Sequence, residues 1–266
     1  MKENLPNEPG SWDLDFSYGY LAQVYAELKS RFRLATLGDA ATYVGDASTP
    51  TAFIRHDVDV SLRRALQLAR QEQAWGARST YHVMMDSPFY DVRSAESKAI
   101  LDEIAAGGHE LGLHYDVMVR GMDRADPAVR ERDIAAACDA FAELRGAPVR
   151  SVSFHLPIQD LLRGPLTIGG RVSGYADDLF RWYLSDSRAR WREGAPLESL
   201  ARPRSHILQI LVHPEWWAET NERPEHRLRQ LVIELAKERG EAYEAVRDRL
   251  APHIIYRAAD LESGGF

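Results

Sequence analysis

The sequence contains a single cysteine, Cys138, among 266 residues. No disulfide can form within the chain, which excludes a small fold held together by disulfides. Long apolar runs are also missing, since no segment approaches the ~20 apolar residues that a membrane-spanning helix needs. Basic residues are outnumbered, 33 against 40 acidic ones, and the net charge of −7 argues against general nucleic-acid binding.

A secretory signal is not visible either. The first fifteen residues, MKENLPNEPGSWDLD, hold one lysine and no apolar h-region. We therefore expect a cytoplasmic protein with no membrane and no nucleic-acid partner. Because no repeat, low-complexity tract or long linker divides the chain, we expect one domain over residues 1–266. Helices at about 16–35 and 224–250 would pack on it.

Strand-like and helix-like segments alternate along the chain. Strands are predicted at residues 51–57, 78–85, 109–115, 149–157, 181–187 and 206–214, and helices at residues 61–74, 94–108 and 126–146. Such alternation implies a parallel sheet with right-handed crossovers. At least six strands with long crossovers favour an α/β fold that closes into a complete or incomplete (β/α) barrel over an open sheet.

Titratable residues gather at the C-terminal ends of the predicted strands. They are Asp57, Asp59, His82, His114, Asp116, His155, Asp186 and His213. In parallel α/β folds this rim is where ligands bind. Strand alternation puts Asp57 and Asp59 on one face, where like charges repel unless a cation or a shared proton intervenes. The alternative is an aspartate pair bonded to Arg55 or to backbone amides.

The histidines differ in their expected roles. His114 ends its strand and is a candidate metal ligand, and His155 is a candidate ligand or substrate contact, with a hydrogen-bonded core histidine as the alternative. His213 ends the most apolar strand, and an imidazole at that position suits general acid catalysis near neutral pH. We interpret His82, although it lies among the residues at the strand ends, as structural, and likewise His56, His109 and Glu110.

Other polar and aromatic residues lie near the same rim. Asp186 and Arg188 could pair with each other or orient a catalytic neighbour. Tyr115, Trp216 and Trp217 are candidate substrate contacts that could stack on a sugar ring, with simple packing as the alternative.

Five motifs in this order resemble the polysaccharide deacetylase family, the NodB-homology group of metal-dependent amide hydrolases. They are HDVD (56–59), GHELGLHYD (108–116), SVSFHLP (151–157), LSDSRARW (184–191) and LVHPEWW (211–217). The resemblance implies a seven-stranded barrel that is incomplete or distorted. It also implies a catalytic role for Asp57 as general base and for His213 as the acid that protonates the leaving amine.

The resemblance further implies a divalent metal, zinc by default, with iron, cobalt, nickel or manganese as alternatives. Asp59 and His114 would be two of its ligands. The family's second motif carries another histidine four residues after the first, where this chain has Met118, and His155 replaces the third-motif arginine. We therefore expect Asp59, His114 and His155 as the ligand set, with Asp116 as a second candidate for the third ligand.

These features predict a metal-dependent hydrolase that removes an N-acyl group, foremost acetyl, from an amino sugar or related small metabolite. Its partner would be a small-molecule or sugar-linked substrate. Two alternatives stay open. One is a cyclic amide hydrolase of the same superfamily, and the other is an inactive barrel that binds a carbohydrate or a partner protein, which Met118 favours.

Overall fold

The computed structural model describes residues 14–191 and 193–254. Most of the segment read for a secretory signal, residues 1–13, lies outside the described residues, as do the two ends of the predicted domain. No helix within the described part of the chain is long and apolar enough to cross a membrane.

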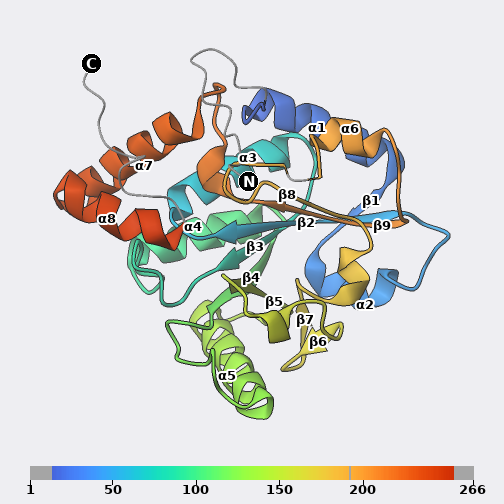
Figure 1. The fold of residues 1–266 in the computed structure, drawn as a ribbon, viewed down its shortest axis with the longest axis horizontal. Helices are drawn as coiled ribbons and strands as arrows, with labels where there is room; N and C mark the ends of the chain where they lie inside the picture. The colour runs from blue at the N-terminus through green and yellow to red at the C-terminus, as the bar shows by residue number, and fades with distance from the viewer. Residues whose placement is uncertain (1–13, 192, 255–266) are drawn as a thin grey trace, which may run out of the picture.

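A curled, mostly parallel sheet forms the centre of the molecule (Figure 1). Along the main path of the sheet, seven strands of the described residues run parallel, in the order β7-β5-β4-β3-β2-β9-β8, and β1 (Arg33–Ala35) lies off this path. The seven are β2 (Thr51–Val58), β3 (Thr80–Val83), β4 (Glu110–Asp116), β5 (Ser151–His155), β7 (Arg171–Ser173), β8 (Tyr183–Ser185) and β9 (Ile207–Val212).

Two short strands complete the sheet. β6 (Thr167–Ile168) runs antiparallel to β7 at one edge, and β1 (Arg33–Ala35) pairs with the start of β2. In the described part of the chain β8 pairs with β9 alone, so the sheet does not close onto β6 or β7. The expected α/β fold with an incomplete, distorted (β/α) barrel is confirmed.

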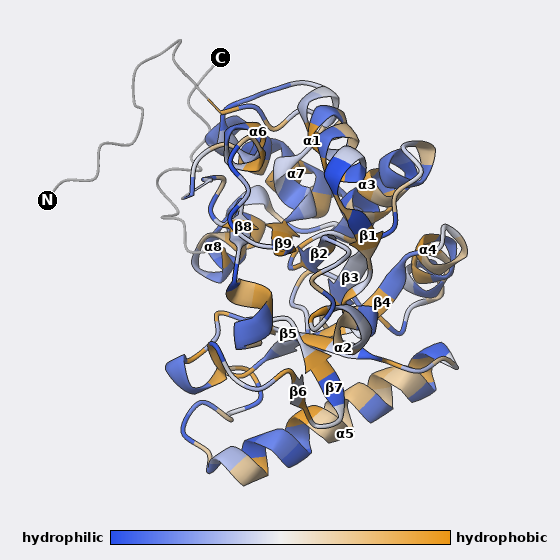
Figure 2. Ribbon diagram, turned by 90° about the vertical axis from the view of Figure 1, so that its right-hand side faces the viewer, coloured by the Kyte–Doolittle hydropathy of each residue, from blue (hydrophilic) through white to orange (hydrophobic). Residues whose placement is uncertain are grey.

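Helices surround the sheet. They are α1 (Tyr18–Arg31), α2 (Ala40–Tyr43), α3 (Leu62–Ala74), α4 (Ala95–Ala106), α5 (Pro127–Arg145), α6 (Pro196–Leu200), α7 (Pro224–Arg239) and α8 (Tyr243–His253), with 3-10 turns η1 (Leu37–Asp39), η2 (Gln159–Leu161), η3 (Asp177–Phe180) and η4 (Pro214–Trp216). Figure 2 shows the apolar and polar faces that these helices carry.

The helix boundaries follow local sequence signals. The Ser94 side chain accepts a hydrogen bond from the Ser97 amide and begins α4, while Gly146 ends α5 with a φ of 62° that glycine adopts without strain. The prediction of a single helix at about 224–250 is wrong, because the structure has two helices in this range. Gly240, with a φ of 64°, ends α7, and α8 begins three residues later.

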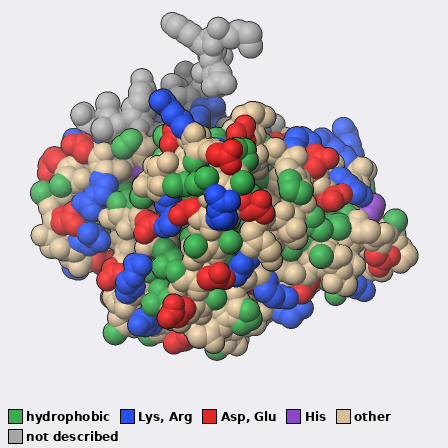
Figure 3. Space-filling view, turned by 90° about the horizontal axis from the view of Figure 1, so that it is seen from below, with side chains coloured by type: hydrophobic (Ala, Val, Ile, Leu, Met, Phe, Trp, Pro, Cys, Tyr) green, Lys and Arg blue, Asp and Glu red, His purple; other side chains and the backbone are tan. Residues whose placement is uncertain are grey.

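The two faces of the sheet differ in polarity because side chains alternate along each strand. Outward residues of β2 and β9, such as Ile54 and Ile210, pack in an apolar core with α1 and α7. The inward residues are mostly polar and buried, among them Arg55, Asp57, His82, Ser151, Ser153 and Gln209. On the outer surface, the face in Figure 3 shows acidic and basic side chains interspersed.

Candidate functional site

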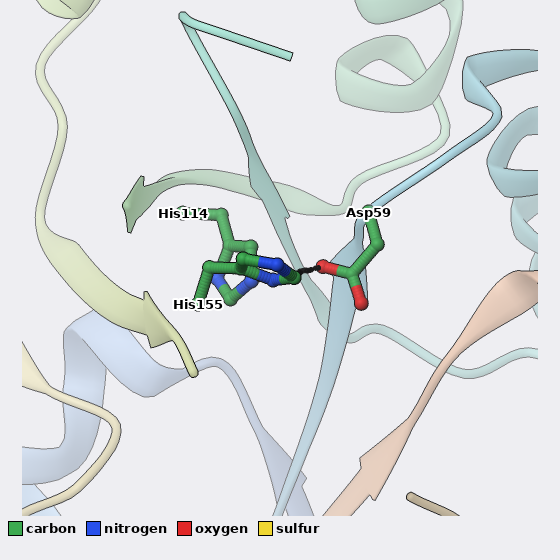
Figure 4. A group of neighbouring side chains, drawn as sticks. All are labelled: Asp59, His114 and His155. Atoms are coloured by element: carbon green, nitrogen blue, oxygen red, sulfur yellow. Dashed lines mark hydrogen bonds and ion pairs between the residues drawn. The ribbon is translucent and has the colours of Figure 1, made fainter. Parts of the chain in front are cut away.

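Asp59, His114 and His155 come together at the mouth of the barrel (Figure 4). Asp59 follows β2, His114 lies on β4 and His155 ends β5. Asp59 Oδ1 lies 3.0 Å from His114 Nε2 and 3.2 Å from His155 Nδ1, and all three side chains are buried. One ligand atom from each lies within 4.8 Å of the others, so this Asp/His/His triad is placed for metal binding.

The hydrogen bonds around His114 fit a metal ligand. Ser153 Oγ lies 2.9 Å from Asp57 Oδ1 and donates to it, and His114 Nδ1 lies 2.6 Å from the same Oγ. Because the hydroxyl proton is used on Asp57, Nδ1–H of His114 donates to the hydroxyl oxygen. In a neutral ring the Nε2 lone pair then faces the Asp59 carboxylate, which requires a cation or a proton between them.

His155 completes the triad rather than Asp116. Asp116 Oδ1 accepts hydrogen bonds from the backbone amides of Met118 and Val119, at 2.9 and 3.0 Å, and so holds the turn after β4. Met118, which stands where the family's second motif has another histidine, is 55% exposed. Asp116, the second candidate for the third ligand, lies outside the triad.

Arg55, buried inside the barrel, keeps the Asp57 carboxylate ionised. Burial would raise its pKa, but Arg55, with Nη2 at 3.0 Å from Oδ2, holds the pKa of Asp57 well below its usual range. The guanidinium lies over the ring of Tyr175 at 4.4 Å, and a Cβ at Gly174 would come within 2.5 Å of Arg55 Nη1. A bond to Arg55, the alternative weighed for the aspartate pair, thus holds for Asp57, whereas Asp59 faces the histidines.

His213 lines the same pocket as the triad and forms a hydrogen-bonded ion pair with Asp186. Its Nδ1 is 2.6 Å from Asp186 Oδ1, and the Asp186 carboxylate also accepts from Trp217 Nε1 at 2.8 Å and from the His213 amide. Burial would lower the pKa of His213, but Asp186 outweighs burial and raises it to about 10. The imidazole is therefore protonated at neutral pH. Trp217 is fully buried and does not line the pocket beside His213, so it is not available to stack on a sugar, and its indole N–H instead positions Asp186.

A pocket of about 200 Å³ opens above these groups. Asp57, Asp59, His114, His155 and His213 all line it, together with Arg188, Glu215, Trp216 and His253. Arg188 and Leu156 on its wall adopt left-handed backbone conformations, with φ of 60° and 43°, which are strained for residues other than glycine. Strain of this kind concentrates at functional sites.

Tyr115 is not brought into this pocket. It lies between His114 and Asp116 on β4, so alternation turns it to the outer face. There its hydroxyl donates to Asp133 of α5 at 2.6 Å, and the Arg120 guanidinium lies over its ring. We therefore do not retain Tyr115 as a candidate substrate contact.

Sequence reasoning missed two residues of the pocket wall. Glu215 is buried two residues after His213, and burial, reinforced by the charge of Asp59, raises its pKa to about 8. Its place in LVHPEWW could have suggested it. His253 comes from the far end of the chain, and the sequence carries no signal that links it to the motifs.

A second buried polar cluster lies on the outer face of β2 and supports the structural interpretation of His56. Glu72 accepts hydrogen bonds from Ser79 and Tyr81, at 2.6 and 2.7 Å, and lies 2.7 Å from His56 Nε2. His56 Nδ1 must donate to the Val212 carbonyl, 3.2 Å away, so in a neutral ring Nε2 can only accept. Burial lowers the pKa of His56 to about 3 and raises that of Glu72 to about 8, which places the proton on Glu72.

Comparison with models of known protein families gives no match, and neither does comparison with curated proteins. Among solved structures, the chain is similar to the Streptococcus pyogenes deacetylase PplD in complex with acetate. Identity is 12%, the TM-score is 0.43, and the match covers 86% of this chain and 92% of that one. It is also similar to BA3943, a CE4 family pseudoenzyme from Bacillus anthracis, and to a mutant of BA3943 with restored enzymatic activity. Both matches have 11% identity and a TM-score of 0.41, over 74% of this chain and 63% and 65% of those chains.

Proposed function

We propose that this protein is a metal-dependent hydrolase that removes an N-acyl group, foremost N-acetyl, from an amino sugar or a related small metabolite. One observation carries the proposal. The Asp59–His114–His155 triad shares a single pocket with an ionised carboxylate, Asp57, and a protonated imidazole, His213. Amide hydrolysis needs an activated water, a stabiliser for the oxyanion and a proton donor for nitrogen.

The triad has the ligand types that zinc prefers, two imidazoles and one carboxylate. A divalent ion held there would supply Lewis-acid polarisation of the acyl carbonyl and a lower pKa for water. Ser153 links the triad to Asp57 by accepting from His114 and donating to the carboxylate. The ligands and the base are thus held in one hydrogen-bonded unit.

Asp57 would act as general base. Its lowered pKa keeps it ionised at neutral pH and therefore able to accept a proton from the attacking water. The same low pKa makes Asp57 a weaker base than an ordinary carboxylate, so the proposed proton transfer depends on a metal that lowers the pKa of the attacking water. Arg55, which keeps Asp57 charged and oriented, would contribute to the reaction only through Asp57.

His213 would act as general acid. Its raised pKa keeps it protonated, and the bond from Nδ1 to Asp186 leaves Nε2–H as the ring proton that can reach the leaving nitrogen. Asp186 would therefore orient the acid rather than take part directly. Trp216 and Arg188, on the pocket wall, are proposed to contact the sugar or its equivalent.

The proposal is tested by incubating the purified protein with Zn²⁺, Co²⁺ or Mn²⁺ and a panel of N-acetyl amino sugars, measuring free acetate. We expect acetate release that falls at least ~100-fold in Asp57→Asn and in His213→Gln. A ring-opened product that is heavier than its substrate by one water, with no fragment released, from a cyclic amide panel, would instead identify the cyclic amide hydrolase. No turnover with any metal, together with carbohydrate binding, would identify the inactive barrel.

A further inference from the structure

The C-terminal end of α8 lies against the triad. His253, the last residue of α8, stacks on the ring of His155 with centroids 4.3 Å apart and planes inclined by 23°. Its Nε2 lies 3.3 Å from the backbone carbonyl oxygen of Asp59. Because a carbonyl oxygen only accepts, Nε2–H of His253 donates to it. One side chain from the far end of the chain thus touches two of the three proposed ligand residues.

The position of His253 is itself fixed. Its ring packs edge-on against Phe89, with centroids 5.0 Å apart, in the loop that follows β3. Arg249 on α8 donates to the Pro88 carbonyl at 3.1 Å, and Arg239 on α7 donates to the Phe89 carbonyl at 3.0 Å. Both helices are therefore docked on this loop.

We infer that His253 is a positioning residue of the metal centre, which holds the His155 ring and the Asp59 backbone in their ligating arrangement. The inference rests on the proposed function, since it needs a metal at the triad. The physical reason is that residues contacting metal ligands fix ligand orientation, and their loss costs typically 10–100-fold in metal affinity. Stacking restricts rotation of the His155 ring, and the bond to the Asp59 carbonyl restrains the chain where β2 ends.

The test measures Co²⁺ and Zn²⁺ affinity by competition with a chelator, and the visible absorption of the Co²⁺ complex, in His253→Ala and His253→Phe. His226→Ala, an exposed histidine on α7, is the matched control. We expect His253→Ala to bind about 10–100-fold more weakly and to shift the Co²⁺ spectrum, because the His155 ring is released. His253→Phe keeps a ring on His155 and loses the donor, so its affinity should lie between those of His253→Ala and wild type.

The possible failures are distinguishable. Wild-type protein that binds one metal, with His253→Ala and His253→Phe matching it in affinity and spectrum, would overturn the inference and leave the metal centre standing. Wild-type protein that binds no metal would overturn the proposed function and this inference with it. If His253→Ala does not fold, as judged by urea unfolding, His253→Phe decides. Wild-type metal affinity and Co²⁺ spectrum in His253→Phe would show that the hydrogen bond from His253 to the Asp59 carbonyl does not matter, and would overturn His253 as a positioning residue.

Discussion

Arg55 Nη2 lies 3.0 Å from Asp57 Oδ2, and both side chains are buried inside the barrel, two residues apart on β2. Removing one partner of a buried ion pair leaves an uncompensated charge. We expect Arg55→Met to lower the free energy of unfolding by about 3–5 kcal/mol, measured by urea denaturation. The double variant Arg55→Met/Asp57→Asn carries no stranded charge and should be more stable than Arg55→Met. A single variant within 1 kcal/mol of wild type would contradict the pairing.

The pH dependence of activity should report the His213–Asp186 pair. Asp186 raises the pKa of His213 to about 10, so the acid is present through neutral pH and is lost as pH rises through about 10. In Asp186→Asn the opposing charge is gone and burial lowers the pKa, so activity should fall at a pH several units lower. The measurement is kcat/KM against pH, with the His213 ring titrated by NMR. Asp178→Asn, which removes a half-buried aspartate that does not line the pocket, is the control. An unmoved profile in Asp186→Asn would rule out His213 as the acid.

Ser153 should matter for metal affinity because it orients His114. Its hydroxyl accepts from His114 Nδ1 and donates to Asp57. Ser153→Ala leaves Nδ1 without this partner, and we expect metal binding to weaken about 10–100-fold in a chelator competition. Ser151→Ala is a matched control, because Ser151 lies on the same face of β5 and contacts His82 and Glu110 instead. Equal affinities in the two variants would argue against the role of Ser153.

Glu72 should make stability depend on pH away from the pocket. The folded protein keeps the Glu72 proton up to about pH 8, whereas the unfolded chain releases it near 4.5, so the contribution of Glu72 to stability falls as pH rises between these values. One proton corresponds to about 1.4 kcal/mol per pH unit within this window. Glu72→Gln keeps a donor for His56 without titrating, so its unfolding free energy should increase relative to that of wild type as pH rises from 5.5 to 7.5. Glu225→Gln, on the outer helix α7, should keep the wild-type dependence, and an unchanged slope in Glu72→Gln would contradict the assignment.

Much of the fold and triad could be predicted because the signals are local. Asp59, His114 and His155 each lie at or near the C-terminal end of a buried strand, and parallel strands bring these ends to one rim. Helix starts such as Ser94 and stops such as Gly146 are read from capping chemistry. Tyr115 could also have been placed correctly, since its alternation with His114 on β4 turns it outward.

The rest depends on contacts that no local pattern records. The Trp217 indole N–H donates a hydrogen bond to Asp186, and the sequence of two adjacent tryptophans does not indicate which of them makes this contact. Arg55 could be paired with either aspartate until the barrel interior fixed its direction. His253 reaches the triad only because Gly240 divides α7 from α8 and turns the chain back toward the mouth.

Metal content of the purified protein, after incubation with excess Zn²⁺ and removal of unbound ion, tests the central claim most directly. We expect one zinc per chain in wild type and in Asp116→Ala, with strong loss in Asp59→Ala, His114→Ala and His155→Ala. Full zinc retention in the three triad variants, or none in wild type, would contradict a metal centre built from Asp59, His114 and His155.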